Sequence, residues 1–322
     1  MRGRSVIEVR QYTPQDAPAW DAVVRQSRNG VFLFERAYMD YHADRFHDAS
    51  LMVFDDDAVV AVLPASIDGT RVVSHGGLTF GGLIVTRGVR ASTTLDALTG
   101  ARDRFASLGA DVLIYKAVPH IYHQLPSEED LYALFRLGAT LVRRDISSTV
   151  AMHDRIRFSK GRAHNAKKAA RSAMIIGPDR AIDEFMAMET ALLLEKYGVA
   201  PVHSTAEMQL LMSRFPGSVR LFSAREDDRL LAGVLIYESA RVAHAQYIAS
   251  TAEGAAKHAL DGVVGYLLDQ VYHEKHFFDF GISTERDGTY LNEGLIAFKE
   301  SCGARAIAYD TYQLPLRPSL TA

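Results

Sequence analysis

One group of residues that could do chemistry lies near the C-terminus, in the stretch from Phe278 to Gly303. Asp279 lies at the end of a predicted strand, so its carboxylate could face a cleft and accept a proton, or it could bond backbone N–H groups of the next loop. Tyr247 on an earlier predicted strand and other polar side chains in this stretch could hydrogen-bond a ligand or only form turns: Ser283, Thr284, Tyr290 and Asn292. We therefore expect a site to be completed here.

A second group is the basic segment from Ser159 to Arg171, which has the spacing of a helix after an N-capping serine. Lys160, Lys167 and Arg171 share one predicted face, with Lys168 beside them. Most charge runs are solvated helix surfaces, and that interpretation stays open. The alternative is a cationic wall for a phosphate-bearing ligand, since Arg and Lys are the residues that bind phosphate.

A third group lies in the first half of the chain. The glycine-rich stretch from Ser74 to Gly82 would let the backbone approach a ligand closely, because glycine has no side chain in the way. Polar residues and a proline follow the next predicted strand, at the end where open α/β sheets bind ligands: Lys116, Pro119, His120, Tyr122 and His123. The two histidines lack a carboxylate partner at a metal-binding spacing, so we expect no metal.

The elements that must position these groups follow the same order in both halves. Hydrophobic periodicity and turn signals predict helices at 13–28 and 32–46, hairpin strands at 51–54 and 59–64, a helix at 93–108 and a strand at 112–116. In the second half they predict helices at 181–197 and 205–215, strands at 219–224, 230–237 and 242–249, a helix at 256–273 and a strand at 276–280. The pattern predicts two related α/β units, residues 1–150 and 151–322, that repeat in architecture and not in sequence.

Composition limits the setting. The 322 residues carry a net charge of −3, so no global field attracts DNA, and 48% are hydrophobic, enough for two cores. The single cysteine, Cys302, has no internal partner, and no signal peptide pattern opens the chain, which favours a cytoplasmic setting. No apolar run reaches the ~20 residues of a membrane-spanning helix, so any membrane contact is expected to be peripheral.

The element order resembles the GNAT acyltransferase unit, and two such units in tandem resemble the Fem-type family. That family includes the aminoacyl transferases of peptidoglycan bridge synthesis and acyltransferases of envelope polysaccharide loci. The similarity lies in Ser159 to Arg162, Tyr247 to Ser250, Phe278 to Gly281, Gly288 and Leu291 to Gly303. It implies an α/β (α+β) fold of two GNAT-like units, each a mixed, mainly antiparallel sheet flanked by helices.

The resemblance also implies a donor site. GNAT units hold the donor pyrophosphate on an Arg/Gln-x-x-Gly-x-Gly/Ala loop, and the nearest match here keeps Gly254 and Ala256 but has Thr251 in front and adds Glu253. Either coenzyme A still binds, with charge supplied by Lys257 or by the basic helix, or the donor is charged tRNA. The residues expected to bind the donor are Ser250, Thr251, Gly254, Ala256, Lys257, Lys160 and Arg162.

For the transfer centre, the resemblance implies that Lys299 stabilises developing negative charge, with water or Asp279 accepting the proton. Without the resemblance, Lys299 would be interpreted as an exposed helical lysine. In the family the first unit helps to hold the acceptor. The residues expected to bind the acceptor are His75, Gly76, Gly77, Lys116, His120, Tyr122, Tyr247, Ser283, Thr284 and Asn292.

The sequence thus predicts an N-acyltransferase that moves an acyl group from acyl-CoA, such as acetyl-CoA, to an amino group of a small sugar or amino-acid precursor of the cell envelope. Two alternatives stay open. One is aminoacyl-tRNA-dependent transfer, in which the basic helix binds RNA. The other is a tandem-GNAT binding module without catalysis, consistent with the altered loop around Gly254.

Overall fold

The chain forms two compact units in a computed structural model that describes residues 7–317. Unit 1 comprises residues 7–145, 286–289 and 308–317, and unit 2 comprises residues 146–285 and 290–307. The chain passes between the units within strands β9 (Thr140–Ala151) and β17 (Arg305–Pro315), and also at both ends of the segment 286–289. The expected boundary after residue 150 lies in β9. The last described residues belong to unit 1 and not to the second half, because β17 pairs with β8 (Val112–Lys116).

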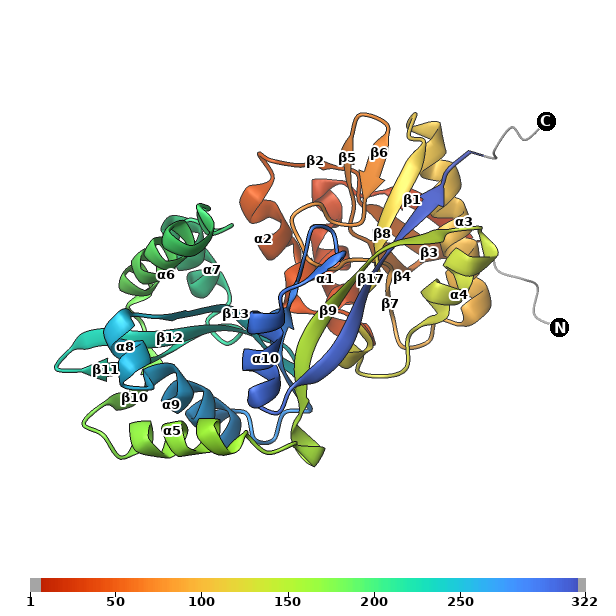
Figure 1. Cartoon of the computed structure of the whole chain (residues 1–322). Coiled ribbons are helices and arrows are strands. Elements are labelled where there is room, and N and C mark those ends of the chain that lie inside the picture. The colour runs from red at the N-terminus through yellow and green to blue at the C-terminus, as the bar shows by residue number, and fades with distance from the viewer. Residues whose placement is uncertain (1–6, 318–322) are drawn as a thin grey trace. The chain divides into compact units, whose positions relative to one another are not determined.

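Unit 1 is a mixed α/β unit (Figure 1). Its antiparallel sheet β1-β3-β4-β7 consists of β1 (Ile7–Gln11), β3 (Leu51–Asp55), β4 (Ala58–Leu63) and β7 (Ile84–Val85). A second set of paired strands, β17-β8-β6-β5-β2, adds β2 (His47–Asp48), β5 (Ser66–Asp68) and β6 (Arg71–Val73). The helices are α1 (Ala17–Gln26), α2 (Arg36–Met39), α3 (Ala91–Ser107) and α4 (Glu129–Arg136). The predicted hairpin at 51–64, the helix predicted at 93–108 and the strand predicted at 112–116 are confirmed.

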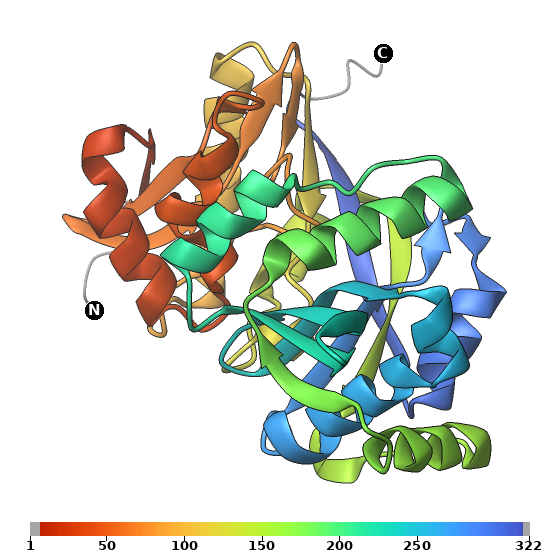
Figure 2. The ribbon, with the colours of Figure 1, turned by 90° about the vertical axis from the view of Figure 1, so that its left-hand side faces the viewer.

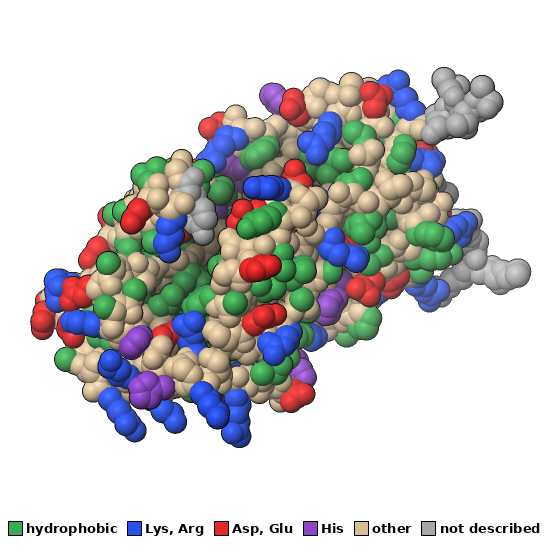
Figure 3. All heavy atoms as spheres, viewed as in Figure 1, with side chains coloured by type: hydrophobic (Ala, Val, Ile, Leu, Met, Phe, Trp, Pro, Cys, Tyr) green, Lys and Arg blue, Asp and Glu red, His purple; other side chains and the backbone are tan. Residues whose placement is uncertain are grey.

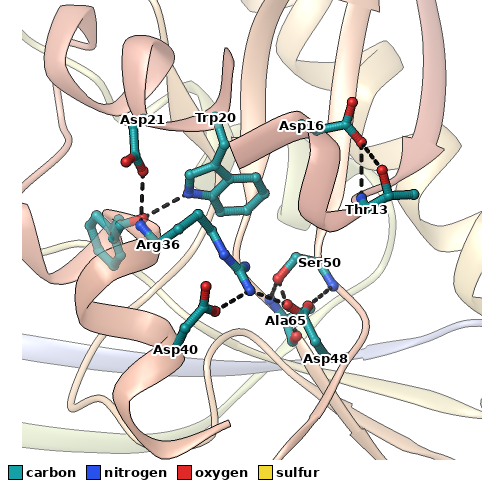
Figure 4. Close-up of polar contacts among 10 residues, drawn as sticks. Thr13, Asp16, Trp20, Asp21, Arg36, Asp40, Asp48, Ser50 and Ala65 are labelled. Carbon is teal, nitrogen blue, oxygen red and sulfur yellow. Dashed lines mark hydrogen bonds and ion pairs between the residues drawn. The ribbon is translucent and has the colours of Figure 1, made fainter. Parts of the chain in front are cut away.

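The predicted helix over 32–46 is wrong, because tertiary contacts divide it. The structure has a 3-10 turn at Phe32–Phe34, the short α2 and a second 3-10 turn at Asp40–His42. The Phe34 carbonyl accepts a hydrogen bond from Trp20 Nε1 at 2.7 Å, and the Arg36 backbone N–H donates to Asp21 Oδ1 at 2.8 Å (Figure 4). Both backbone groups therefore bond to α1 side chains in place of helical partners, and the chain turns sharply here.

Unit 2 contains the strand order β10-β11-β12-β13-β14-β9. These strands are β10 (Ile175–Asp179), β11 (Val219–Glu226), β12 (Arg229–Glu238), β13 (Val242–Ser250) and β14 (Phe277–Ile282), and a small pair, β15 (Thr284–Glu285) and β16 (Tyr290–Leu291), follows. Every pairing is antiparallel except β13 with β14. The helices are α5 (Lys160–Ala170), α6 (Ile182–Tyr197), α7 (Thr205–Arg214), α8 (Ala252–Ala256), α9 (Ala259–Tyr266) and α10 (Glu293–Ser301).

Helices cover both faces of the unit 2 sheet (Figures 1 and 2). Helices α6 and α7 lie on one face, where Gly233 of β12 leaves room for the Phe185 ring; a Cβ at Gly233 would lie 2.7 Å from that ring. Helix α9 packs on the other face, and Val263 and Leu267 share a buried cluster with Phe222. The helix predicted over 256–273 is interrupted, because His258 has a left-handed φ of 60° between α8 and α9.

Candidate functional site

Strands β13 and β14 separate partway along their length. They pair in parallel register only through Val242 with Phe277, Ala243 with Phe278 and His244 with Asp279, among the residues described. Beyond that point β13 continues along β12, with a register shift that leaves Gln246 as an extra residue, a β-bulge. The edge of β13 on the β14 side therefore has backbone groups without a strand partner directly after His244.

Asp279 lies at the point of separation and is fully buried, with 0% exposure. Its Oδ1 accepts hydrogen bonds from Ser147 Oγ at 2.6 Å and Thr149 Oγ1 at 2.7 Å, and its Oδ2 lies 2.7 Å from His244 Nδ1. Burial alone would raise the pKa of Asp279, but the bonds from His244, Ser147 and Thr149 outweigh it and lower the pKa below its usual value. The carboxylate is therefore ionised and accepts from His244 Nδ1–H, so Nε2 is the ring nitrogen left for another partner.

Lys299 lies in α10 and is 3% exposed, so the alternative of a surface lysine is wrong. Its Nζ donates to the Gly281 carbonyl at 2.8 Å and to the Ile282 carbonyl at 2.7 Å. Burial lowers the pKa of Lys299 to about 8, although the charge of Asp279 acts in the opposite direction. An ammonium group has three N–H bonds, so one donor remains for another partner near the end of β14.

Asn292 connects this lysine to the loop after β14. Its side chain caps α10 by accepting from the Leu295 N–H at 3.0 Å, and its backbone N–H donates to the Ser283 carbonyl at 2.9 Å. Ser283 is buried, and Thr284 Oγ1 accepts from the Ile146 N–H at 3.4 Å. The structure thus brings together four residues that the sequence singled out in this stretch: Asp279, Ser283, Asn292 and Lys299.

The residues expected to bind the donor lie at α8, where they contact one another or neighbouring strands. Thr251 caps the helix by accepting from the Gly254 N–H at 2.9 Å, and Ser250 Oγ donates to the Leu231 carbonyl at 3.2 Å. A Cβ at Gly254 would lie 2.0 Å from the Leu231 carbonyl oxygen, so close packing alone accounts for this glycine. Ala256 is exposed.

The charges near α8 are paired. Glu253 bonds to Arg229 at 2.6 Å and lies 2.9 Å from Lys257, which also pairs with Glu226. These contacts offset the negative charge of Glu253, the acidic residue by which this loop departs from the usual GNAT pattern. They also leave Lys257 less available for a ligand phosphate.

Helix α5 begins as predicted, with Ser159 Oγ accepting from the Arg162 N–H at 3.3 Å. Arg162 points inward, where it pairs with Asp261 and lies 4.6 Å above the Phe298 ring. Lys160 is exposed, as are the other cations of the helix: Lys167, Lys168 and Arg171. Figure 3 shows basic side chains along the lower edge, where α5 lies in Figure 1, and none of these four has an ion pair among the described residues.

The residues expected to hold the acceptor in unit 1 do not share one environment. Lys116 bonds to the Leu78 carbonyl, and burial lowers its pKa to about 8. Tyr122 is buried with its ring 4.6 Å from that of Phe80, whereas His120 is exposed. His75, Gly76 and Gly77 lie beside His42, and the charge of Lys116 also acts on His75.

Sequence reasoning missed His244, whose only signal is a polar residue on a predicted strand. It also missed the partners of Tyr247: His203 Nδ1 lies 2.7 Å from the Tyr247 hydroxyl, and the charge of the buried Glu189 acts on the same hydroxyl. Burial raises the pKa of Glu189 to about 7, and its Oε2 has no hydrogen-bond partner among the described residues. These contacts join α6, the loop before α7 and β13, so only the tertiary structure reveals them.

Residues 7–317 include no group of three or more His, Cys, Asp or Glu side chains placed to hold a metal ion. In the same range, none of the helices combines the length and the apolar character needed to cross a membrane.

Residues 159–290 match the acetyltransferase (GNAT) domain family. Comparison with curated proteins finds no match. Among solved structures, FemX aligns with a TM-score of 0.68 and 12% identity over 94% of this chain and 96% of that one.

Two further structures have the same architecture. The C-terminal domain of a putative lysylphosphatidylglycerol synthetase from Agrobacterium fabrum aligns with a TM-score of 0.60 and 12% identity, over 93% of this chain and 91% of that one. A tandem GNAT protein from the clavulanic acid biosynthesis pathway aligns with a TM-score of 0.53 and 12% identity, over 98% of this chain and 100% of that one. At such identities these likenesses show the fold, and with the domain match they confirm the predicted fold of two tandem GNAT-like units, as in FemX.

Proposed function

We propose that this chain, which contains a GNAT domain match over residues 159–290 and has the tandem fold seen in FemX, transfers an acyl group from acyl-CoA to an amino group on a sugar or amino-acid precursor of the cell envelope. The observation that carries the proposal is the separation of β13 from β14 at the pair His244 and Asp279. An extended donor with amide groups, such as the pantetheine arm of coenzyme A, could bond to the free edge of β13 as an added strand does.

The residues at the separation have complementary roles in this proposal. His244 Nε2 takes a proton from the acceptor amine, while Asp279 holds the ring through Nδ1 and stabilises the imidazolium that forms. Asp279 thus becomes a positioning residue and not the proton acceptor considered from sequence, because its lowered pKa makes it a weak base.

The amine nitrogen then attacks the thioester carbonyl, and the oxyanion that forms is stabilised by the remaining Lys299 N–H and by backbone N–H groups at the Gln246 bulge. Collapse of the tetrahedral intermediate breaks the carbon–sulfur bond. Coenzyme A leaves as a thiolate that receives the proton from His244, the nitrogen loses its second proton to water, and the amide is the other product.

The test measures acyl transfer directly. Purified protein is mixed with acetyl-CoA and with amino sugars or amino acids, and thiol release is measured together with the mass of the acylated product. Acceptor-dependent thiol release with a matching mass gain of the acceptor supports the proposal. Neither product with any acyl-CoA across a panel of chain lengths would reject it.

A second candidate is aminoacyl-tRNA-dependent transfer, which the exposed face of α5 favours. Residues 155–178 contain no Asp or Glu, so this surface suits a polyanion. The test compares tRNA binding by the wild type and a Lys167→Ala, Lys168→Ala, Arg171→Ala variant. Loss of about 0.9 in the logarithmic salt slope for each phosphate contact removed would support this donor. Equal binding by both proteins excludes it.

The loop at α8, capped by its own Thr251 and paired at Glu253, keeps the non-catalytic binding module as a third candidate. The thiol-release assay distinguishes this candidate from the acyltransferase, because a binding module releases no thiol.

A further inference from the structure

The position of Lys299 depends on how the C-terminal end of α10 is held, because Lys299 lies in the last turn of that helix. Its Nζ bonds to two backbone carbonyls, those of Gly281 and Ile282, and it has no ion pair within residues 7–317. The Asn292 cap fixes the other end of the helix, about 10 Å away along the axis. The last turn therefore needs an anchor of its own.

That anchor is the first turn of α5. The Ser159 backbone N–H donates to the Ser301 carbonyl at 2.9 Å, and Arg162 Nε donates to Ser301 Oγ at 3.2 Å. The Arg162 guanidinium also lies 4.6 Å above the Phe298 ring, within the range of a cation–π contact. Phe298 directly precedes Lys299, and Ser301 follows it by two positions, so these contacts lie on both sides of the lysine in the chain.

The guanidinium is itself fixed from a third side. Arg162 forms an ion pair with Asp261 of α9, whose carboxylate is buried. A guanidinium is planar, and its N–H bonds point in fixed directions. One rigid group thus connects three helices: α5, which carries it, α9 through Asp261, and α10 through Phe298 and Ser301. All of these residues belong to unit 2.

We propose that Arg162 is a positioning residue, which fixes the last turn of α10 so that Lys299 Nζ stays at the carbonyls of Gly281 and Ile282. The sequence predicts that Arg162 binds the donor, whereas its contacts in the structure are with protein groups. The consequence for turnover rests on the proposed function. The consequence for the environment of Lys299 does not.

Arg162→Lys separates positioning from charge. The substitution keeps a cation opposite Asp261, so the buried carboxylate is not left unpaired, which would itself destabilise unit 2. It removes the flat group that lies on Phe298 and the fixed directions of the N–H bonds. The last turn of α10 should then loosen and admit water. Burial holds the pKa of Lys299 at about 8, so hydration should raise that pKa by about one unit toward its ordinary value of 10.5.

The experiment measures this pKa in full-length protein labelled with ¹³C at the lysine ε carbon, titrated between pH 6 and 11. The Lys299 signal is identified by its absence in Lys299→Met. The matched control is Arg155→Lys, since Arg155 also pairs with a carboxylate, that of Asp269 at 2.7 Å, and lies 5.4 Å above a ring, that of Phe158. The pKa should rise in Arg162→Lys and stay unchanged in the control.

An unchanged Lys299 pKa in folded Arg162→Lys overturns the proposal, and so does an equal rise in Arg155→Lys. If Arg162→Lys does not fold, Ser301→Ala decides. This variant removes the hydroxyl that accepts from Arg162 and leaves the pair with Asp261 in place. A raised Lys299 pKa in Ser301→Ala supports the proposal, and the wild-type value overturns it.

Turnover distinguishes positioning from donor binding. Near pH 7, Arg162→Lys should lower kcat for thiol release by about 10–10²-fold with KM for acyl-CoA unchanged, because displacement of a group at the reacting atoms by about 1 Å has effects of this size. A raised KM with unchanged kcat would assign Arg162 to the donor and overturn the proposal.

The positioning role and the proposed function can fail separately, because the Lys299 titration needs no acyl transfer. A raised Lys299 pKa in Arg162→Lys, together with no transfer by the wild type, rejects the proposed function alone. Transfer by the wild type, together with the same Lys299 pKa in both proteins, rejects the positioning role alone.

Discussion

His244 Nδ1 lies 2.7 Å from Asp279 Oδ2, and these two residues form the last register pair of the parallel strands β13 and β14. The contact therefore marks the position where the sheet of unit 2 opens. It also fixes the His244 ring, because a buried and ionised carboxylate accepts only from a protonated Nδ1.

Replacing His244 by Asn should preserve the bond to Asp279 but remove the nitrogen that takes up a proton. We expect kcat to fall by about 10²–10⁴-fold near pH 7, and the deficit to shrink as pH rises and more of the acceptor amine is already deprotonated. Rates of thiol release between pH 6 and 10 measure this. His273→Asn is the control, and a His244→Asn protein with the wild-type pH profile would show that His244 is not the base.

Lys299→Met should lower kcat by about 10²–10³-fold, because the oxyanion loses a charged donor. The pKa of about 8 predicts that the lysine charge is present below pH 8 and lost above it, so wild-type turnover should decline through that range. Lys299→Arg should move the decline to higher pH. Lys275→Met is the matched control, since Lys275 also donates to a backbone carbonyl, that of Ser239 at 2.7 Å. Full activity in folded Lys299→Met contradicts the assignment.

Glu189→Gln should stabilise the protein at alkaline pH. The folded pKa of Glu189 is raised to about 7 from an ordinary value of 4.5, so its favourable contribution is complete below pH 4.5 and is lost as pH rises through 7. Gln does not ionise, so the gain in unfolding free energy should be small at pH 5 and about 1–3 kcal/mol at pH 8. Urea unfolding measures it, with Glu195→Gln on the exposed side of α6 as control. A gain that does not vary with pH would exclude ionisation as its cause.

Gly254→Ala should destabilise unit 2 by about 1–3 kcal/mol, because its Cβ would lie 2.0 Å from the Leu231 carbonyl oxygen. Gly161→Ala in α5 is the matched control: no atom lies within 4 Å of a Cβ there, so better helix propensity should stabilise by about 0.5 kcal/mol. Thermal unfolding of both variants provides the comparison. A neutral Gly254→Ala would mean that α8 can move away from β12, and that packing does not explain this glycine.

Much of the architecture could be predicted from the sequence because it depends on local patterns. The hairpin around Asp56, with its left-handed φ of 53°, and the Ser159 cap of α5 follow from turn and capping chemistry. The break in the helix predicted over 32–46 could not be predicted, since it depends on Trp20 and Asp21 reaching the backbone from another helix.

The sequence by itself determined the residue types near the proposed transfer site: Asp279, Asn292 and Lys299 lie within about twenty residues, and a cap and a strand end place them. Only the tertiary structure decided their environment. Burial lowered the pKa of Lys299, and hydrogen bonds from β9 and β13 kept Asp279 ionised and joined it to His244. These environments arise from residues distant in the chain, so they exist only once the chain is folded.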